Sequence, residues 1–279
     1  MPAPARLRSM LLPGIALGVL LAVVARGSAG NAAAGTLRPR PVPVVAPSCP
    51  TAAPTTAAGY ARLFAQLPTS QWGAADLAVT VPVDGRSVWL FGDTMSSGPT
   101  GTGRFVHSTA IVQRRGCLHV SNGGAQLLPD GRTEATPTRA HPSHIYWIVS
   151  GRALTSTSLE VTARSILVFG TGAWDFEDGG VSRAALVDLD PVGDLTLRGW
   201  LRTWRSPPPD AGALINCDAP RPPRKHHFCY ARHVHPELRL AGGQVLVTVA
   251  QNWDDGTLHR FADYRPLFQA VPASSVVDR

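Results

Sequence analysis

Apolar residues in this 279-residue chain form one helical pattern, followed by a long series of short β-type stretches. The helical pattern places apolar side chains at i, i+3, i+4 and i+7, at Tyr60, Leu63, Phe64 and Leu67. Thr55 and Thr56 offer N-caps, and Pro68 ends the pattern. Later stretches are rich in β-branched and aromatic residues and are bounded by Gly, Asp and Pro, which is typical of strands. The pattern predicts an all-β domain preceded by one helix.

The clearest strand pair lies in residues 72–94, WGAADLAVTVPVDGRSVWLFGDT. Its centre is Asp84-Gly85, a strong signal for a two-residue hairpin loop. With these two residues as the loop, residue i faces residue 169 − i. Val79 then lies opposite Leu90, and Asp76 lies opposite Asp93.

Strand pairs recur along the rest of the chain, and the predicted sheet units begin near residues 76, 107, 144, 182 and 235. No helices alternate with them, which excludes a parallel α/β fold. Both faces of the first hairpin are apolar, whereas a sandwich sheet usually has one solvated face. A propeller blade is buried on both faces by its neighbours. We therefore expect a five-bladed β-propeller over residues 59–279, with a β-sandwich as the alternative.

The first residues have the features of a signal peptide over residues 1–29. Arg6 and Arg8 precede an apolar run at 10–24, and small residues supply a cleavage site near Ala29. The run is shorter than the about 20 residues of a membrane span, so we expect no span after cleavage. Residues 30–58 are rich in Ala, Pro and Thr and predict a flexible spacer. The mature protein is expected to be secreted and extracellular, in association with the cell envelope if the spacer tethers it.

Net charge and the absence of binding motifs narrow the classes of partner, cofactor and metal that the sequence predicts. Removing residues 1–29 takes away three arginines and no acids, so the formal net charge falls from +7 by three to +4. No basic run is interleaved with aromatic residues, which argues against nucleic-acid binding. No cofactor-binding motif is present, and no oligomeric state is predicted. The histidines near residue 230 lack zinc-ligand spacing, so no metal site is predicted either.

An even number of cysteines in an exported chain predicts two disulfides, with three possible pairings. Cys217 and Cys229 bracket a Pro- and Arg-rich loop and form the favoured local pair. Cys49 and Cys117 would then tie the spacer to the domain.

The opposed pair Asp76 and Asp93 is the first candidate for catalysis. Directly opposed residues on a sheet hold their Cβ atoms about 4.5–5.5 Å apart, so two carboxylates there repel each other. Repulsion raises one pKa and leaves the other group ionised, as acid/base work requires. Alternatively, a bulge breaks the register, and each aspartate only caps a strand end.

Three motifs in this order resemble a known family: the 72–94 segment, HSTAIVQ from residue 107, and HPELRLAGGQVLVTVAQNW followed by DYRPLF from residue 235. The family consists of secreted actinobacterial five-bladed propellers of formerly unknown function and includes endo-D-arabinanases. The likeness is best over residues 72–113 and 233–268. It implies that Asp76 and Asp93 are catalytic, and that the family's polar motif positions correspond to His107, Ser108, His235, Glu237 and Asn252.

In a propeller the inner strands start at one rim of the central channel, where Asp76, Ser108, His144 and Glu237 would converge. Glu237 is the candidate third catalytic acid, and the acidic loop with Asp175, Glu177 and Asp178 is the weaker alternative. The candidate substrate-binding residues are Trp72 as a stacking platform, with His107, Ser108, His235 and Asn252. These features predict a glycoside hydrolase that acts on a cell-envelope or environmental polysaccharide. One alternative is a non-catalytic propeller that binds glycan or protein at the same rim. Another is an envelope structural protein that the spacer tethers to the surface.

Overall fold

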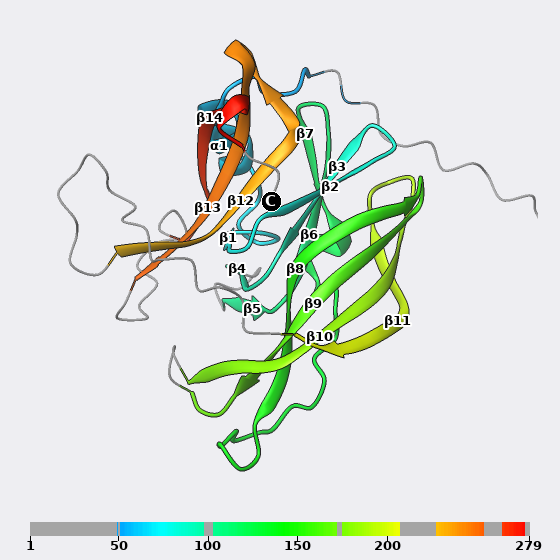
Figure 1. Ribbon diagram of the computed structural model, residues 1–279, viewed down its shortest axis with the longest axis vertical. Helices are drawn as coiled ribbons and strands as arrows, with labels where there is room; N and C mark the ends of the chain where they lie inside the picture. Colours follow the sequence, from blue (N-terminus) through cyan, green and yellow to red (C-terminus); the bar gives the residue numbers. More distant parts are fainter. Residues whose placement is uncertain are drawn as a thin grey trace, which may run out of the picture. The chain divides into compact units, whose positions relative to one another are not determined.

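The computed structural model describes residues 49, 51–97, 103–171, 175–206, 227–253 and 264–276 (Figure 1). All of them belong to the compact unit Pro43–Arg279. The described residues form one α-helix, short 3-10 turns and four antiparallel sheets, so the all-β class is confirmed. The 3-10 turns are η1 (Ser121–Gly124), η2 (Ala241–Gly243) and η4 (Ala273–Ser275).

Helix α1 (Ala57–Ala65) forms where the apolar spacing predicts it. The Thr56 side chain accepts a hydrogen bond from the Gly59 N–H at 3.0 Å, which satisfies a donor that the first turn leaves free. Tyr60 and Phe64 are buried. The Phe64 ring packs on Phe268 of β14 at a centroid distance of 5.1 Å, which holds the helix against that strand.

The first large sheet has the strand order β2-β3-β6-β7. Its strands are β2 (Val79–Val83), β3 (Arg86–Phe91), β6 (Thr109–Arg114) and β7 (Cys117–Val120). Val79 pairs with Leu90 and Val81 with Val88, as the hairpin arithmetic predicts. Asp84 and Gly85 have φ values of 49° and 68°, the left-handed conformation that a two-residue hairpin loop of this kind requires.

Both faces of this sheet are buried. One face contributes Val81, Val88 and Leu90 to a core shared with the sheet of strands β8 to β11. The other contributes Trp89, Phe91 and Ile111 to a core shared with α1 and the sheet of strands β12 to β14. The two-sided apolar pattern of the hairpin thus reflects its place between two cores.

A small sheet, β1-β4-β5, continues the first hairpin beyond a break. Its strands are β1 (Ala74–Ala75), β4 (Thr94–Ser96) and β5 (Arg104–Val106). Ala74 pairs with Met95 and Ala75 with Thr94, which is the register of the β2–β3 ladder extended. The break lies at Leu77, whose φ is 52°.

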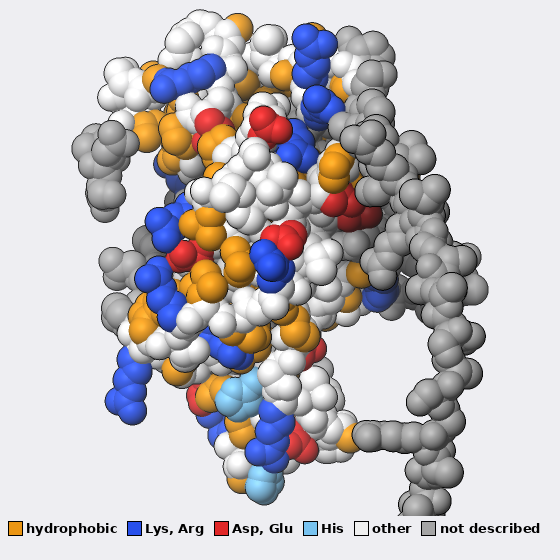
Figure 2. All heavy atoms as spheres, turned by 90° about the vertical axis from the view of Figure 1, so that its right-hand side faces the viewer, with side chains coloured by type: hydrophobic (Ala, Val, Ile, Leu, Met, Phe, Trp, Pro, Cys, Tyr) orange, Lys and Arg blue, Asp and Glu red, His pale blue; other side chains and the backbone are white. Residues whose placement is uncertain are grey.

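The two remaining sheets have the orders β11-β10-β9-β8 and β12-β13-β14. Their strands are β8 (Ser143–Thr155), β9 (Ser158–Val168), β10 (Phe176–Leu189), β11 (Leu195–Arg205), β12 (His227–Leu240), β13 (Gln244–Trp253) and β14 (Leu267–Pro272). Figure 2 shows basic side chains dispersed among acidic and apolar ones on the side of the molecule that it faces. In the sheet of strands β8 to β11, Arg152 and Arg202 both form ion pairs with Glu160.

The division into five sheet units is wrong. The units expected from residues 76 and 107 share one large sheet, and those from 144 and 182 share another. The reason is that β3 still has an unpaired edge after forming the hairpin, and β6 fills it, with Leu90 opposite Ala110. A closed ring of five blades is not found in the described residues.

Cys49 is bonded to Cys117, which confirms that predicted pair. Cys229 is also disulfide-bonded, and its expected partner Cys217 lies outside the described residues. Within the described ranges, no helix is both long and apolar enough to cross a membrane.

Candidate active site

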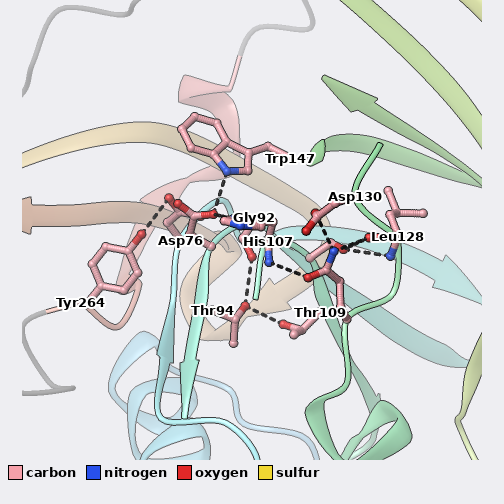
Figure 3. A network of polar contacts seen from close by, with 12 residues as sticks. Asp76, Gly92, Thr94, His107, Thr109, Leu128, Asp130, Trp147 and Tyr264 are labelled. Carbon is pink, nitrogen blue, oxygen red and sulfur yellow. Dashed lines mark hydrogen bonds and ion pairs between the residues drawn. The ribbon is translucent and has the colours of Figure 1, made fainter. Parts of the chain in front are cut away.

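Asp76 and Asp93 lie opposite each other at the break in the first hairpin, and Figure 3 shows Asp76 with its neighbours Gly92 and His107. Asp76 directly follows β1, and Asp93 directly precedes β4. The Asp76 N–H donates to the Asp93 carbonyl at 3.1 Å, so the backbone register predicted for this pair is confirmed. Asp76 is only 3% exposed, and the Asp93 side chain is 15% exposed.

Two tyrosines hold Asp76. Its Oδ2 accepts hydrogen bonds from the hydroxyls of Tyr230 at 2.8 Å and Tyr264 at 3.1 Å. Tyr230 lies in β12 beside a bulge at Ala231, whose φ is 46° and where the β12–β13 register shifts. Bulges of this type redirect neighbouring side chains. Asp76 Oδ1 is buried, and no hydrogen-bond partner for it is found among the described residues.

Asp93 has different partners. Its Oδ1 accepts from His107 Nδ1 at 2.9 Å and from Trp147 Nε1 at 2.7 Å. Figure 3 shows Trp147 and Tyr264 on different sides of Asp76. His107 follows β5, and Trp147 comes from β8, so two sheets supply the donors to this carboxylate.

The two environments separate the protonation states of the pair. Burial, followed by the charge of Asp93, raises the pKa of Asp76 to about 8 although its tyrosine partners oppose this. Burial also raises the pKa of Asp93, against the opposing effect of His107 and Trp147. Burial lowers the pKa of His107, but its hydrogen bond to Asp93 and the nearby carboxylate charges outweigh this, and the net shift is upward. Asp93 lies beside His107, whose pKa is raised, whereas Asp76 has only neutral donors, so the proton of the pair is held on Asp76 at neutral pH.

Close packing fixes the Asp76 carboxyl in place. A Cβ atom at Gly92 would lie 2.5 Å from Asp76 Oδ1 and 2.8 Å from Leu77 Cδ1. No side chain fits at that distance, so the glycine of the Gly-Asp-Thr motif is needed for the carboxyl to lie against the backbone of the facing strand.

Further contacts position the donors to Asp93. The side-chain oxygen of Gln126 accepts from the backbone N–H of His107 at 3.4 Å, and its Nε2 donates to Asp130 at 2.7 Å. The imidazole of His107 packs edge-on against Phe105, which is 48% exposed. The Trp147 ring packs in the same way on Phe176.

Several predicted site residues lie elsewhere. Trp72 is fully buried between Phe64 and Phe91, so it offers no face to a sugar, and the stacking prediction is wrong for this structure. Ser108 is also fully buried, and its hydroxyl accepts from the Leu128 N–H at 2.9 Å, which anchors a loop.

His235 and Glu237 form a separate cluster. His235 is buried between the hydroxyls of Thr80 and Thr248, at 2.6 and 2.7 Å, and Thr80 also donates to Glu237. Glu237 lies seven residues along β12 from Tyr230, roughly 20 Å at the rise of a strand. The structure therefore does not bring Glu237 to the carboxyl pair.

The other predicted positions lie nearer the ends of strands. Asn252 pairs with Phe228 in the β12–β13 ladder, two residues beyond Ala250, the partner of Tyr230. His144 lies near the start of β8, where its backbone bonds to Gly131 and Arg132.

Sequence reasoning missed the two tyrosines and the role of Trp147 as a donor. Tyr264 belongs to the DYRPLF motif that carries part of the family resemblance, and that motif was the available signal. Nothing in the sequence around Tyr230 predicts its contact with Asp76, because the two residues are 154 positions apart.

No protein-family model matches the chain, and no curated protein matches it. Among solved structures, it is similar to a protein from Bacteroides ovatus that carries the provisional description of a hydrolase. The two are 12% identical, with a TM-score of 0.42, over 78% of this chain and 90% of the other. A likeness at this level does not establish a shared activity.

Proposed function

We propose that this protein is a secreted glycoside hydrolase acting on a cell-envelope or environmental polysaccharide, with an arabinan as the first candidate. The observation that supports this most is the asymmetry of the opposed carboxyls. Asp76 is enclosed by neutral tyrosines, whereas Asp93 is held by an imidazole and an indole N–H. The arabinan itself rests on the resemblance of the hairpin and DYRPLF motifs, as does the five-bladed propeller, which stays a prediction.

Glycoside hydrolysis needs one carboxylic acid as proton source and one carboxylate that attacks the anomeric carbon or activates water. Asp76 suits the first role because its pKa of about 8 keeps it protonated at neutral pH. Asp93 suits the second. Both of its donors bind Oδ1, and the described residues place no hydrogen-bond donor on Oδ2.

The second candidate function is a non-catalytic glycan-binding protein. The deep burial of Asp76 favours it, because an enclosed acid also occurs in purely structural networks. The two candidates differ in pH dependence. Hydrolysis requires a protonated Asp76, so kcat/KM falls as the pH rises through about 8, whereas glycan binding does not require that proton.

The test is to incubate the purified mature protein with arabinans, galactans and xylans and to measure released oligosaccharides. We expect Asp76→Asn and Asp93→Asn each to lower turnover by at least about 100-fold with the fold intact. Asp194→Asn is the matched control, because Asp194 binds His119 at 2.8 Å in another Asp–His pair. Wild-type rates in either site variant would refute the catalytic assignment, and binding without cleavage would favour the second candidate.

A further inference from the structure

The proton of Asp76 has no direct path to a substrate. Its Oδ1 is buried against Gly92 and Leu77, where not even a methyl group fits. Its Oδ2 is covered by the hydroxyls of Tyr230 and Tyr264. With the residue 3% exposed, a departing sugar oxygen cannot come within hydrogen-bond distance of this carboxyl as it stands.

The two tyrosines differ in their access to solvent. Tyr264 is 3% exposed and so is enclosed together with Asp76. Tyr230 is only partly buried, and it lies beside the bulge at Ala231. Of the two tyrosines that touch the Asp76 carboxyl, Tyr230 is therefore the one that retains exposed surface.

We propose that Tyr230 is a further catalytic residue, which relays the proton of Asp76 to the departing glycosidic oxygen. This proposal rests on the glycoside hydrolase function proposed above. In the reacting arrangement Asp76 Oδ2 carries the proton and donates it to the Tyr230 oxygen, and the phenolic hydrogen of Tyr230 is turned towards the glycosidic oxygen. As the bond from the anomeric carbon to that oxygen breaks, the phenolic proton moves to the glycosidic oxygen, and the proton on Asp76 Oδ2 moves to the Tyr230 oxygen. Tyr230 remains a neutral phenol, and Asp76 becomes a carboxylate. Water supplies the new hydroxyl at the anomeric carbon and a proton to Asp93, and exchange with solvent then restores the starting protonation.

The pKa values of Asp76 and Tyr230 require these two groups to act together. Burial and the neighbouring carboxylate raise the pKa of Tyr230 well above 10, so the phenol alone is a poor acid at neutral pH. A tyrosine that receives the Asp76 proton while releasing its own never becomes a phenolate. The buried Asp76 carboxyl is thus the source of the proton, and the Tyr230 hydroxyl is the group that contacts the departing oxygen.

The experiment compares Tyr230→Phe with Tyr264→Phe, since each variant removes one hydroxyl from Asp76 Oδ2. The substrates are the polysaccharide that the wild type cleaves and the 2,4-dinitrophenyl glycoside of its sugar, whose leaving group needs no proton. We expect Tyr230→Phe to lose at least about 100-fold in kcat/KM on the polysaccharide and less than about tenfold on the activated glycoside.

Tyr264→Phe is the matched control. It removes a hydrogen bond that lowers the pKa of Asp76. We therefore expect the alkaline limb of its kcat/KM profile to move to higher pH, with a smaller loss of rate than in Tyr230→Phe. Tyr146→Phe, which removes a hydroxyl bound to Arg183, should leave both rates unchanged.

Three outcomes would overturn the relay. These are a Tyr230→Phe variant within about threefold of wild type on the polysaccharide, an equal loss on both substrates at an unchanged melting temperature, or an equal effect of the two tyrosine changes. Failure of the proposed function looks different, because the wild type itself then releases no oligosaccharide from any polysaccharide, and the relay falls with it.

Discussion

At the residue scale, the site depends on keeping a carboxylic acid neutral where water cannot reach it. An unfolded chain releases the Asp76 proton near pH 3.9, whereas the folded chain holds it to about pH 8. Between these values unfolding releases a proton, so the free energy of unfolding falls as the pH rises. The stability contributed by the bound proton is complete below the lower value and is lost as the pH rises through about 8.

This linkage predicts how Asp76→Asn changes stability. The amide carries no charge at any pH and still offers an oxygen to Tyr230 and Tyr264. We expect its melting temperature to exceed that of the wild type at pH 8, and the gap to shrink towards pH 5. Thermal unfolding monitored by circular dichroism at several pH values measures this gap.

The control for this prediction is Asp178→Asn, because folding lowers the pKa of Asp178 whereas it raises that of Asp76. The hydrogen bond from Arg164 lowers the pKa of Asp178, so this carboxyl is ionised in both folded and unfolded chains from pH 5 to pH 8. Asp178→Asn should therefore destabilise the protein by the same amount across that range. A pH-independent gap for Asp76→Asn would contradict the raised pKa of Asp76.

At the element scale, helix α1 offers a matched pair of threonines. Thr56 caps the helix through its side chain. The neighbouring Thr55 instead accepts a hydrogen bond from the Ala241 N–H through its backbone carbonyl. Replacing an N-cap threonine by alanine costs about 1 kcal/mol. We expect Thr56→Ala to lower the free energy of unfolding by that amount in urea titrations, and Thr55→Ala to change it by less than about 0.5 kcal/mol. Equal losses in the two variants would contradict the assigned cap.

How far the sequence predicts this structure depends on how local each signal is. The register that opposes Asp76 to Asp93 follows from a two-residue turn and survives the break at Leu77. Sheet membership is less local, because the pairing of β3 with β6 depends on which edges remain free once the hairpins have formed. The predicted division into five sheet units is wrong at this point, because β6 joins the sheet of the first hairpin.

Side-chain environments were the hardest to predict. Trp72 stands close to Asp76 in the sequence, yet Phe64 of α1 and Phe91 of β3 enclose its ring. The tyrosines that hold Asp76 come from the other end of the domain, and no spacing rule links them to it. Local periodicity therefore predicted the carboxyl pair but not what surrounds it.

At the scale of the whole molecule, the Cys49–Cys117 bond closes a loop with a sequence separation of 68 residues. It joins the segment before α1 to the first residue of β7. In the chain-entropy model, a loop of this length is worth about 4 kcal/mol. We expect the double variant Cys49→Ala, Cys117→Ala to lose roughly that much stability in urea titrations. A double variant within about 1 kcal/mol of wild type would show that the unfolded chain is already restricted without the bond.

The tyrosine contacts of Asp76 span 154 and 188 residues of the chain. Contacts between such distant segments form late in folding, because the entropy of closing the intervening loops must be overcome first. A nascent or truncated chain that lacks its last strands still has a hairpin with two aspartates, but the one at position 76 is then an ordinary, water-exposed carboxylate. The buried, protonated form of Asp76 therefore does not exist before Tyr230 and Tyr264 are in place, and a fragment without them lacks the asymmetry of the carboxyl pair.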